Sequence, residues 1–216
     1  MNISTFVTLT LVSVILSLLV QFGIMRYFFL HMKCSKGYVE KYSKLPKSKD
    51  HKRVIVTLSL KPEEINAFKP TLNSLLDQSV SVDSIVTNTE NHKKYEIPEY
   101  VRQACQIGLA GDSFDEALAL IPTLLREGEA GTVVISVQNG IVYGKDYIQT
   151  LLETLNDVKK PVVTEYGVCA NAGDFKAGVT SAGRQDVCDW YKAYLPETFY
   201  LKYKENYSSI PKILKK

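Results

Sequence analysis

The chain has 216 residues, of which 45% are hydrophobic and 23% charged, as in a globular protein with one domain and an appendage. Its formal net charge of +3 is too small to indicate nucleic acid, and no nucleic-acid partner is expected. The four cysteines form no C-x-x-C pair and do not cluster with the three histidines. We therefore expect unpaired thiols rather than a zinc site or a disulfide framework.

The chain begins with an apolar segment. The run from Phe6 to Met25 has about the 20 residues that a helix needs to cross the hydrocarbon core of a bilayer. It is longer than the apolar region of a signal peptide, and no small-residue cleavage site follows it, although a cleaved signal is the alternative. We expect residues 1–31 to form a transmembrane anchor, with the aromatic residues 27–29 at the interface.

Basic residues follow the apolar segment. Lysines dominate residues 32–52, against only Glu40 and Asp50. The positive-inside rule then predicts a single-pass membrane protein whose globular part lies in the cytoplasm. Residues 32–52 are expected to form a solvated, irregular juxtamembrane linker, with contact to anionic headgroups as the alternative.

Beyond residue 53, apolar strands alternate with amphipathic helices. Strands are expected at 53–59, 81–87, 105–109, 132–137 and 162–164. Helices are expected at 63–78, 99–104, 113–126 with a kink at Pro122, and 147–158. This alternation predicts an α/β fold, with a mostly parallel sheet and flanking helices. After about residue 170 the pattern weakens.

The segment from Thr132 to Leu152 is the centre of this pattern. Its buried strand ends in the polar triplet Gln138-Asn139-Gly140, and a turn at 144–146 leads into the next helix. Open α/β sheets bind their ligands outside the carboxyl ends of the strands. The triplet therefore marks the predicted site.

Residues 53–165 resemble the nucleotide-binding half of a family 2-like glycosyltransferase of the GT-A fold, of the polysaccharide-biosynthesis type. The resemblance is carried by Val54–Leu58, Phe68–Ser79 with its LNSLLDQS pattern, Lys94–Tyr100, Ala119–Leu124, Val134–Tyr143 and Asp146–Leu151. It implies a GT-A-like (Rossmann-like) domain over residues 53–216, with a nucleotide sugar as the donor.

The resemblance also implies a nucleotide subsite. The first strand's end and the loop after the second strand hold the base and ribose in that family. The matching positions in this chain are Thr57, Ser59, Asn88 and Glu90. The alternative is that these side chains only complete the ends of the strands.

The triplet departs from the family's pattern. Such enzymes carry an acidic Asp-x-Asp there, whose carboxylates hold a divalent cation on the donor diphosphate. Gln138, Asn139 and Gly140 offer no carboxylate, and Ala119 stands where the family typically has a lysine. The usual Tyr-Pro-Pro-Asp turn reads Tyr-Gly-Lys-Asp at 143–146. No metal ligand is therefore assigned, and a divalent metal is not expected as a cofactor.

The acceptor half is short. A carboxylate base would deprotonate the acceptor hydroxyl, and the candidates after the triplet are Asp174, Asp186 and Asp189. Asp186, Asp189 and Trp190 faintly resemble the acidic, Trp-bearing motifs of processive members. A solvated helical turn around one packed tryptophan is the alternative explanation.

Three hypotheses follow. The favoured one is a membrane-anchored glycosyltransferase-like protein with weak or no catalysis, anchored beside an active glycosyltransferase partner. The second is an active, metal-independent enzyme of glycan or polysaccharide biosynthesis, in which Lys145 or Arg184 supports the diphosphate. The third is a membrane-surface binder that works through the basic linker and the tail lysines Lys202, Lys204, Lys212, Lys215 and Lys216.

Overall fold

Strands and helices alternate in the computed structural model of the chain, which describes residues 2–32, 35–48, 50, 53–90, 96–110, 118–127, 131–159, 161–164, 167–172 and 199–200. The strands are β1 (Arg53–Ser59), β2 (Ser84–Glu90), β3 (Gln106–Ala110), β4 (Thr132–Val137), β5 (Val162–Thr164), β6 (Gly167–Asn171) and β7 (Phe199–Tyr200). The helices are α1 (Ile3–Met32), α2 (Ser35–Tyr42), α3 (Ile65–Leu76), α4 (Glu99–Ala104), α5 (Ile121–Arg126) and α6 (Tyr147–Val158), with a 3-10 turn at Pro62–Glu64 before α3. The predicted bounds of β1, β4, β5, α4 and α6 are confirmed.

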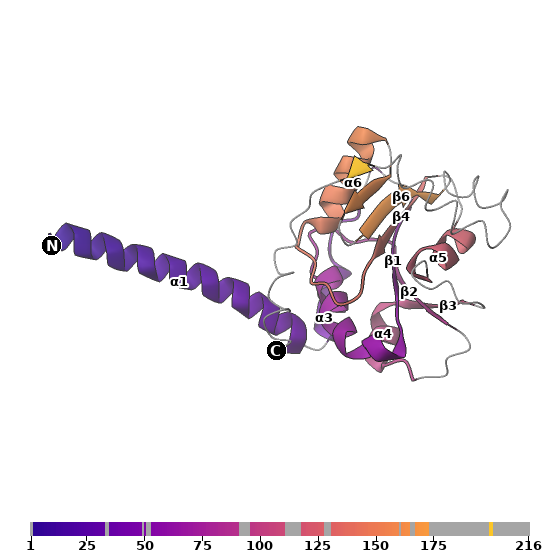
Figure 1. Cartoon of the computed structure of the whole chain (residues 1–216), viewed down its shortest axis with the longest axis horizontal. Helices are drawn as coiled ribbons and strands as arrows, with labels where there is room; N and C mark the ends of the chain where they lie inside the picture. Colours follow the sequence, from indigo (N-terminus) through magenta and orange to yellow (C-terminus); the bar gives the residue numbers. More distant parts are fainter. Residues whose placement is uncertain are drawn as a thin grey trace. The chain divides into compact units, whose positions relative to one another are not determined.

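The described strands form one sheet in the order β3-β2-β1-β4-β6-β5-β7 (Figure 1). β1 is parallel to β2 and β4, β2 is parallel to β3, and β5 is parallel to β7. β6 pairs antiparallel with both β4 and β5. The mostly parallel α/β sheet predicted from the sequence is thus confirmed. The strand order reverses between β1 and β4, which is where an open sheet of this kind leaves a crevice at its carboxyl edge.

Helices cover both faces of the sheet (Figure 1). α5 lies on the face to which Thr57 of β1 points, since the Thr57 hydroxyl contacts Thr123 of α5. α3 and α6 lie on the opposite face. Gln78 and Ser79, which follow α3, join the two helices: the Gln78 side chain accepts from the Ile148 amide of α6, and the Ser79 hydroxyl donates to Gln149 of α6. Because both faces are covered, β1 is buried from Val54 to Leu58, which explains its unbroken apolar and β-branched sequence.

The basic stretch after α1 contains a packed helix. Residues 35–42, expected to be part of an irregular linker, form α2, which contacts α3 and α4. Ser35 is fully buried and Tyr38 is nearly so, and Lys41 forms an ion pair with Asp77 at 3.0 Å. The expectation of an irregular linker is therefore wrong for this part. The chain divides into Met1–Lys33 and Cys34–Lys216, so the second unit begins nineteen residues before the expected start of the domain at residue 53.

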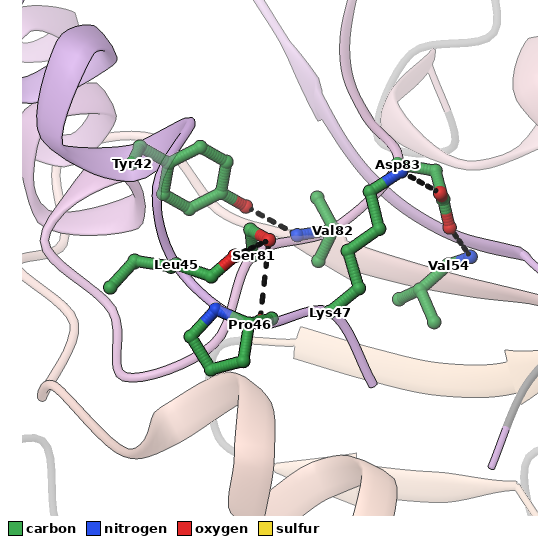
Figure 2. Close-up of polar contacts among 8 residues, drawn as sticks. All are labelled: Tyr42, Leu45, Pro46, Lys47, Val54, Ser81, Val82 and Asp83. Atoms are coloured by element: carbon green, nitrogen blue, oxygen red, sulfur yellow. Dashed lines mark hydrogen bonds and ion pairs between the residues drawn. The ribbon is translucent and has the colours of Figure 1, made fainter. Parts of the chain in front are cut away.

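Polar contacts join residues 42–47 to the loop before β2 (Figure 2). The Val82 amide donates to the Tyr42 hydroxyl at 2.7 Å, and the Ser81 hydroxyl donates to the Leu45 carbonyl at 3.0 Å. Lys47 donates to Asp83 at 2.7 Å, and the other carboxylate oxygen of Asp83 accepts from the Val54 amide at 2.8 Å. Burial would raise the pKa of Asp83, but the bonds from Lys47 and the Val54 amide outweigh it, so the pKa is lowered.

These contacts also explain why β2 begins later than predicted. The strand was expected over 81–87 and is found at Ser84–Glu90. The Ser81 amide bonds to the Pro46 carbonyl and the Val82 amide to the Tyr42 hydroxyl, so these two amides are not available to β1. The Asp83 amide is the first of this segment to bond to β1, at the Val54 carbonyl. The polar residues Asn88, Thr89 and Glu90, expected beyond the strand, are its buried carboxyl end.

Two further expectations differ from the structure. Pro122 lies in the first turn of α5 and begins that helix, so the predicted kink within a longer helix is wrong; residues 111–117 lie outside the described part. Pro lacks the amide hydrogen that a first turn leaves unpaired anyway, which suits it to this position. β6 was not expected, because Gly167-Val-Cys-Ala-Asn171 is short and has one β-branched residue.

α1 is 30 residues long and has a mean hydropathy of 2.4 in its most apolar window, enough in length and composition to cross a membrane. Most of its large apolar side chains whose burial is described are exposed, although Leu30 is buried. This agrees with the predicted apolar N-terminal segment.

A substitution at Gly167 of β6 tests how closely α6 approaches the sheet. A Cβ atom at this position would lie 2.5 Å from the Tyr147 hydroxyl oxygen and 2.7 Å from the Ser136 carbonyl oxygen. The backbone oxygen cannot move aside without disturbing β4, so we expect Gly167→Ala to lower the free energy of unfolding by about 1–3 kcal/mol. Denaturant unfolding of the full chain in detergent measures this change.

The matched control is Gly37→Ala. Gly37 lies in the helix α2, and a Cβ atom there meets no heavy atom within 4 Å. Alanine in an open helical position should leave stability unchanged or raise it by about 0.5–1 kcal/mol. Equal effects of the two substitutions would contradict the close approach at Gly167.

Candidate functional site

The predicted site residues gather at the carboxyl edge of the sheet. Ser59 at the end of β1 pairs with Asn88 of β2, and Thr57 pairs with Ser136 of β4. β4 ends at Val137, so the triplet 138–140 leaves the sheet beside β1. The reversal of strand order therefore brings the end of β1 and the triplet side by side at this edge, where open sheets of this kind bind their ligands.

Thr57 and Asn88 belong to a buried hydrogen-bond network beneath α5. The Asn88 amide nitrogen lies 3.1 Å from Thr57 Oγ1, 2.9 Å from Thr123 Oγ1 and 2.9 Å from the Ala119 carbonyl. Thr57 Oγ1 also lies 2.7 Å from Thr123 Oγ1 and donates to the Ala119 carbonyl. Both side chains are fully buried. Their polar groups hold the start of α5 on the sheet.

Arg126 completes this network, and the sequence did not single it out. One of its terminal nitrogens donates to Asn88 Oδ1 at 2.5 Å. Gly108 of β3 leaves the space for this contact, because a Cβ atom there would collide with both groups. Burial lowers the pKa of the Arg126 guanidinium, while Glu127 beside it acts in the opposite direction. An arginine stays charged despite such a shift, so Arg126 brings one cation to this face of the sheet.

Ser59 and Glu90 lie at the ends of their strands. Ser59 is partly exposed, whereas Glu90 is buried with 6% of its surface exposed. Ser59 is thus the one predicted nucleotide residue of the four with a partly exposed side chain.

The triplet has its backbone fixed on both sides. The Tyr143 hydroxyl accepts from the Gln138 amide at 2.9 Å and donates to the Gln138 carbonyl at 3.1 Å, while the Gln138 side chain is exposed. The Asn139 side-chain nitrogen donates to the carbonyl and a carboxylate oxygen of Glu64, at 3.3 and 3.4 Å. This contact joins the loop after β4 to the turn after β1, across the crevice.

Gly140 has a left-handed backbone, with φ of 82°. Its amide donates to Thr71 Oγ1 at 3.0 Å and to Asn139 Oδ1 at 2.8 Å. A side chain at this position would be strained by roughly 1–2 kcal/mol, although Asp and Asn tolerate it better than most. The third position of the triplet thus has a backbone suited to glycine rather than to a carboxylate.

A row of polar side chains on α3 and just after it holds the segment that follows the triplet. The Ser74 hydroxyl accepts from the Tyr143 amide at 3.0 Å. The Gln78 amide nitrogen donates to the Gly144 carbonyl at 2.6 Å, and its oxygen accepts from the Ile148 amide at 3.1 Å. Together with Thr71, these residues recur at helical spacing and are buried. Ser74 and Gln78 are two of the five polar residues of the LNSLLDQS pattern.

Gln78 also caps α6. The first amides of a helix have no partner within it, and Ile148 is the second residue of α6. Asp146, at the N-cap position, makes no side-chain capping bond. A glutamine from another part of the chain thus supplies the cap, so α6 and the segment before it depend on α3.

Charged and metal-binding groups are sparse around this edge. Among the described residues, no three His, Cys, Asp or Glu side chains gather to hold a metal ion. Lys145 is exposed in the turn before α6, and its carbonyl accepts from the Ser79 amide at 2.7 Å. The candidate bases Asp174, Asp186 and Asp189, and Arg184, lie outside the described residues.

The described cysteines offer no nucleophile. Cys105 and Cys169 are free and buried. Burial raises the pKa of Cys105 to about 12 and that of Cys169 further still. Both are therefore protonated at neutral pH and unreactive.

Comparison with known proteins supports the fold. No protein-family model matches the chain, and no curated protein sequence matches it significantly. Its structure is similar to that of the mannosyltransferase PcManGT from Pyrobaculum calidifontis, solved in complex with GDP-Man and Mn2+. The TM-score is 0.53 at 13% identity, over 86% of this chain and 67% of that one. The chain therefore has a glycosyltransferase-like fold.

Replacing Gln78 tests whether this side chain holds the segment from Tyr143 to Leu151 in place. Gln78→Ala leaves the Ile148 amide and the Gly144 carbonyl without their partner, so we expect a loss of about 2–4 kcal/mol in the free energy of unfolding. Hydrogen exchange of the amides from Tyr143 to Leu151 should accelerate more than that of β1.

The control is Gln103→Ala. Gln103 is an exposed glutamine whose side-chain nitrogen donates to Glu99 at 3.2 Å within the same helix, so its replacement should change stability by less than about 0.5 kcal/mol. If Gln78→Ala is equally mild and exchange in α6 is unchanged, Gln78 does not hold the segment.

Proposed function

We propose that the chain is a membrane-anchored glycosyltransferase-like protein in which metal-dependent sugar transfer is weak or lost, and which acts beside an active glycosyltransferase. The observation that carries this proposal is the state of the triplet. Its side chains supply no carboxylate, and its backbone is held by Glu64, Thr71 and Tyr143. Amide oxygens alone lack the charge that makes Mg²⁺ or Mn²⁺ binding strong.

Two features of the triplet support the loss of a cation site. Asn139 directs its amide nitrogen toward the Glu64 carboxylate, so the carboxylate nearest to the triplet is engaged with a hydrogen-bond donor. Gly140 has a positive φ, at which side chains other than Asp and Asn are strained, and the glycine found there supplies no side-chain ligand.

Two of the four side chains predicted to bind the nucleotide are likewise engaged in hydrogen bonds within the protein. Thr57 and Asn88 use their polar groups on Ala119, Thr123 and Arg126. A base or ribose at this edge would then meet Ser59 and backbone groups rather than those two side chains. Nucleotide binding, where it persists, is expected to be weak.

Exposed cations favour a second candidate function, a metal-independent glycosyltransferase. Lys145 projects from the turn after the triplet, and Arg126 lies at the Asn88 end of the network. A diphosphate needs neutralised charge, which lysine and arginine provide without a metal. In this case the leaving group would be held by side chains alone.

Calorimetry of the full chain in detergent with UDP and GDP, with and without Mn²⁺, separates these functions. The favoured proposal predicts weak or undetectable binding that Mn²⁺ leaves unchanged. Micromolar binding strengthened by Mn²⁺ would overturn it. Binding that is independent of metal and at least about tenfold weaker in Lys145→Ala would instead favour the metal-independent enzyme.

Comparing Ser59→Ala with Thr57→Ala shows which of the two hydroxyls contributes to nucleotide affinity and which to stability. Any residual affinity should fall in the Ser59 variant, because that hydroxyl is partly exposed. Thr57→Ala removes a buried network group and is expected to lower stability by about 1–3 kcal/mol instead. Loss of affinity in the Thr57 variant at unchanged stability would restore Thr57 as a direct ligand.

A further inference from the structure

The residues that follow the apolar helix are part of the globular unit rather than a flexible tether. α2 packs on α3 and α4, and residues 42–47 are bonded to the loop at 81–83 (Figure 2). The Lys41–Asp77 pair, at 3.0 Å, and the Lys47–Asp83 pair, at 2.7 Å, add to this attachment. Lys47 also forms a parallel bridge with Ser81. The polypeptide from Ser35 to Lys47 is therefore held at several points.

This attachment limits the distance between the globular unit and a bilayer crossed by α1. The apolar run ends at Met25, and seven helical residues from Arg26 to Met32 rise about 10 Å, which is close to the depth of the headgroup layer. Only Lys33 and Cys34 separate Met32 from α2, so the Cα atoms of Met32 and Ser35 lie within about 11 Å. The start of α2 thus lies close to the headgroups.

The exposed charges near the start of α2 are mostly positive. Lys41 and Lys47 are neutralised by Asp77 and Asp83. Lys36 and Lys44 are exposed, with the exposed Glu40 against them. Lys33 adds a further positive charge in the sequence. Cations within a Debye length of about 10 Å are attracted to anionic lipids.

We propose that the exposed side of α2 and the turn after it, carrying Lys36 and Lys44, is a docking surface for anionic lipid headgroups, which holds the globular unit on the membrane in a fixed orientation. The proposal rests on the part of the proposed function that places α1 across a membrane, and it is independent of nucleotide binding. The partner is the headgroup layer, because the covalent link brings this surface to it.

Depth-dependent fluorescence quenching tests the proposal on the full chain in vesicles. Cys34→Ser and Cys188→Ser leave the buried thiols of Cys105 and Cys169, whose raised pKa values protect them from labelling. A fluorophore is then attached at Gly37→Cys or Ser43→Cys, which are exposed and keep Lys36 and Lys44, or at the exposed Glu153→Cys of α6 as the matched control. The vesicles contain phosphatidylcholine with or without phosphatidylglycerol, and a headgroup nitroxide is the quencher.

We expect the labels at 37 and 43 to be quenched several-fold more than the label at 153. Equal quenching at all three positions would overturn the proposal. Alkaline carbonate extraction of the same vesicles reports on α1 separately, because a chain released by carbonate lacks the anchor on which the proposal rests.

A longer connection between α1 and α2 distinguishes binding to anionic lipids from simple proximity imposed by the covalent link to α1. Insertion of about 12 Gly and Ser residues between Met32 and Ser35 adds a mean reach of about 20 Å. With phosphatidylglycerol, quenching at position 43 should persist, and Lys36→Gln should weaken the docking about fivefold. Without it, or at about 1 M salt, quenching should vanish. Loss of quenching in the anionic vesicles at low salt would show tethering alone and contradict the docking surface.

Discussion

The candidate site depends on two hydrogen bonds of the Gln78 side chain, which donates to the Gly144 carbonyl and accepts from the Ile148 amide. A buried glutamine satisfies three hydrogen bonds here, and an unsatisfied buried backbone group costs about 1–3 kcal/mol. The segment from the triplet to α6 has little regular structure of its own. Its conformation is set by α3, through Thr71, Ser74 and Gln78.

The same end of α3 contacts α2, the helix that follows α1 in the chain. Asp77 pairs with Lys41 of α2, and the next residue, Gln78, holds the segment before α6. Ser79 then bonds to Lys145 and Gln149. Three consecutive residues thus join α2 to the turn beside the triplet. These contacts fix the conformation of the sheet edge at which the triplet lies.

Much of the fold could be predicted from residue pattern. Continuous apolar runs marked β1 and β4, because strands buried on both faces need no polar alternation. The start of β2 and the helix at 35–42 could not be predicted, since both depend on contacts between residues about 40 apart, such as Tyr42 with Val82. β6 was missed because its pairing with β4, rather than its composition, makes it a strand.

The site was only partly predictable for a similar reason. The sequence located the triplet and its lack of carboxylates. It did not indicate that Asn88 would bond to Arg126, or that Asn139 would reach Glu64, because these partners are 38 and 75 residues away. The polar letters of LNSLLDQS were recognisable as a pattern, but their role required the position of Tyr143 and Ile148.

The central claim is that the triplet is a fixed structural element without a divalent cation. Paramagnetic broadening by Mn²⁺ tests it most directly, on isotope-labelled full chain in detergent with GDP present. The account predicts that the amide signals of Gln138, Asn139 and Gly140 keep their intensity at equimolar Mn²⁺, to the same degree as those of α4. Selective loss of these three signals at that concentration would show a cation bound at the triplet and contradict the account.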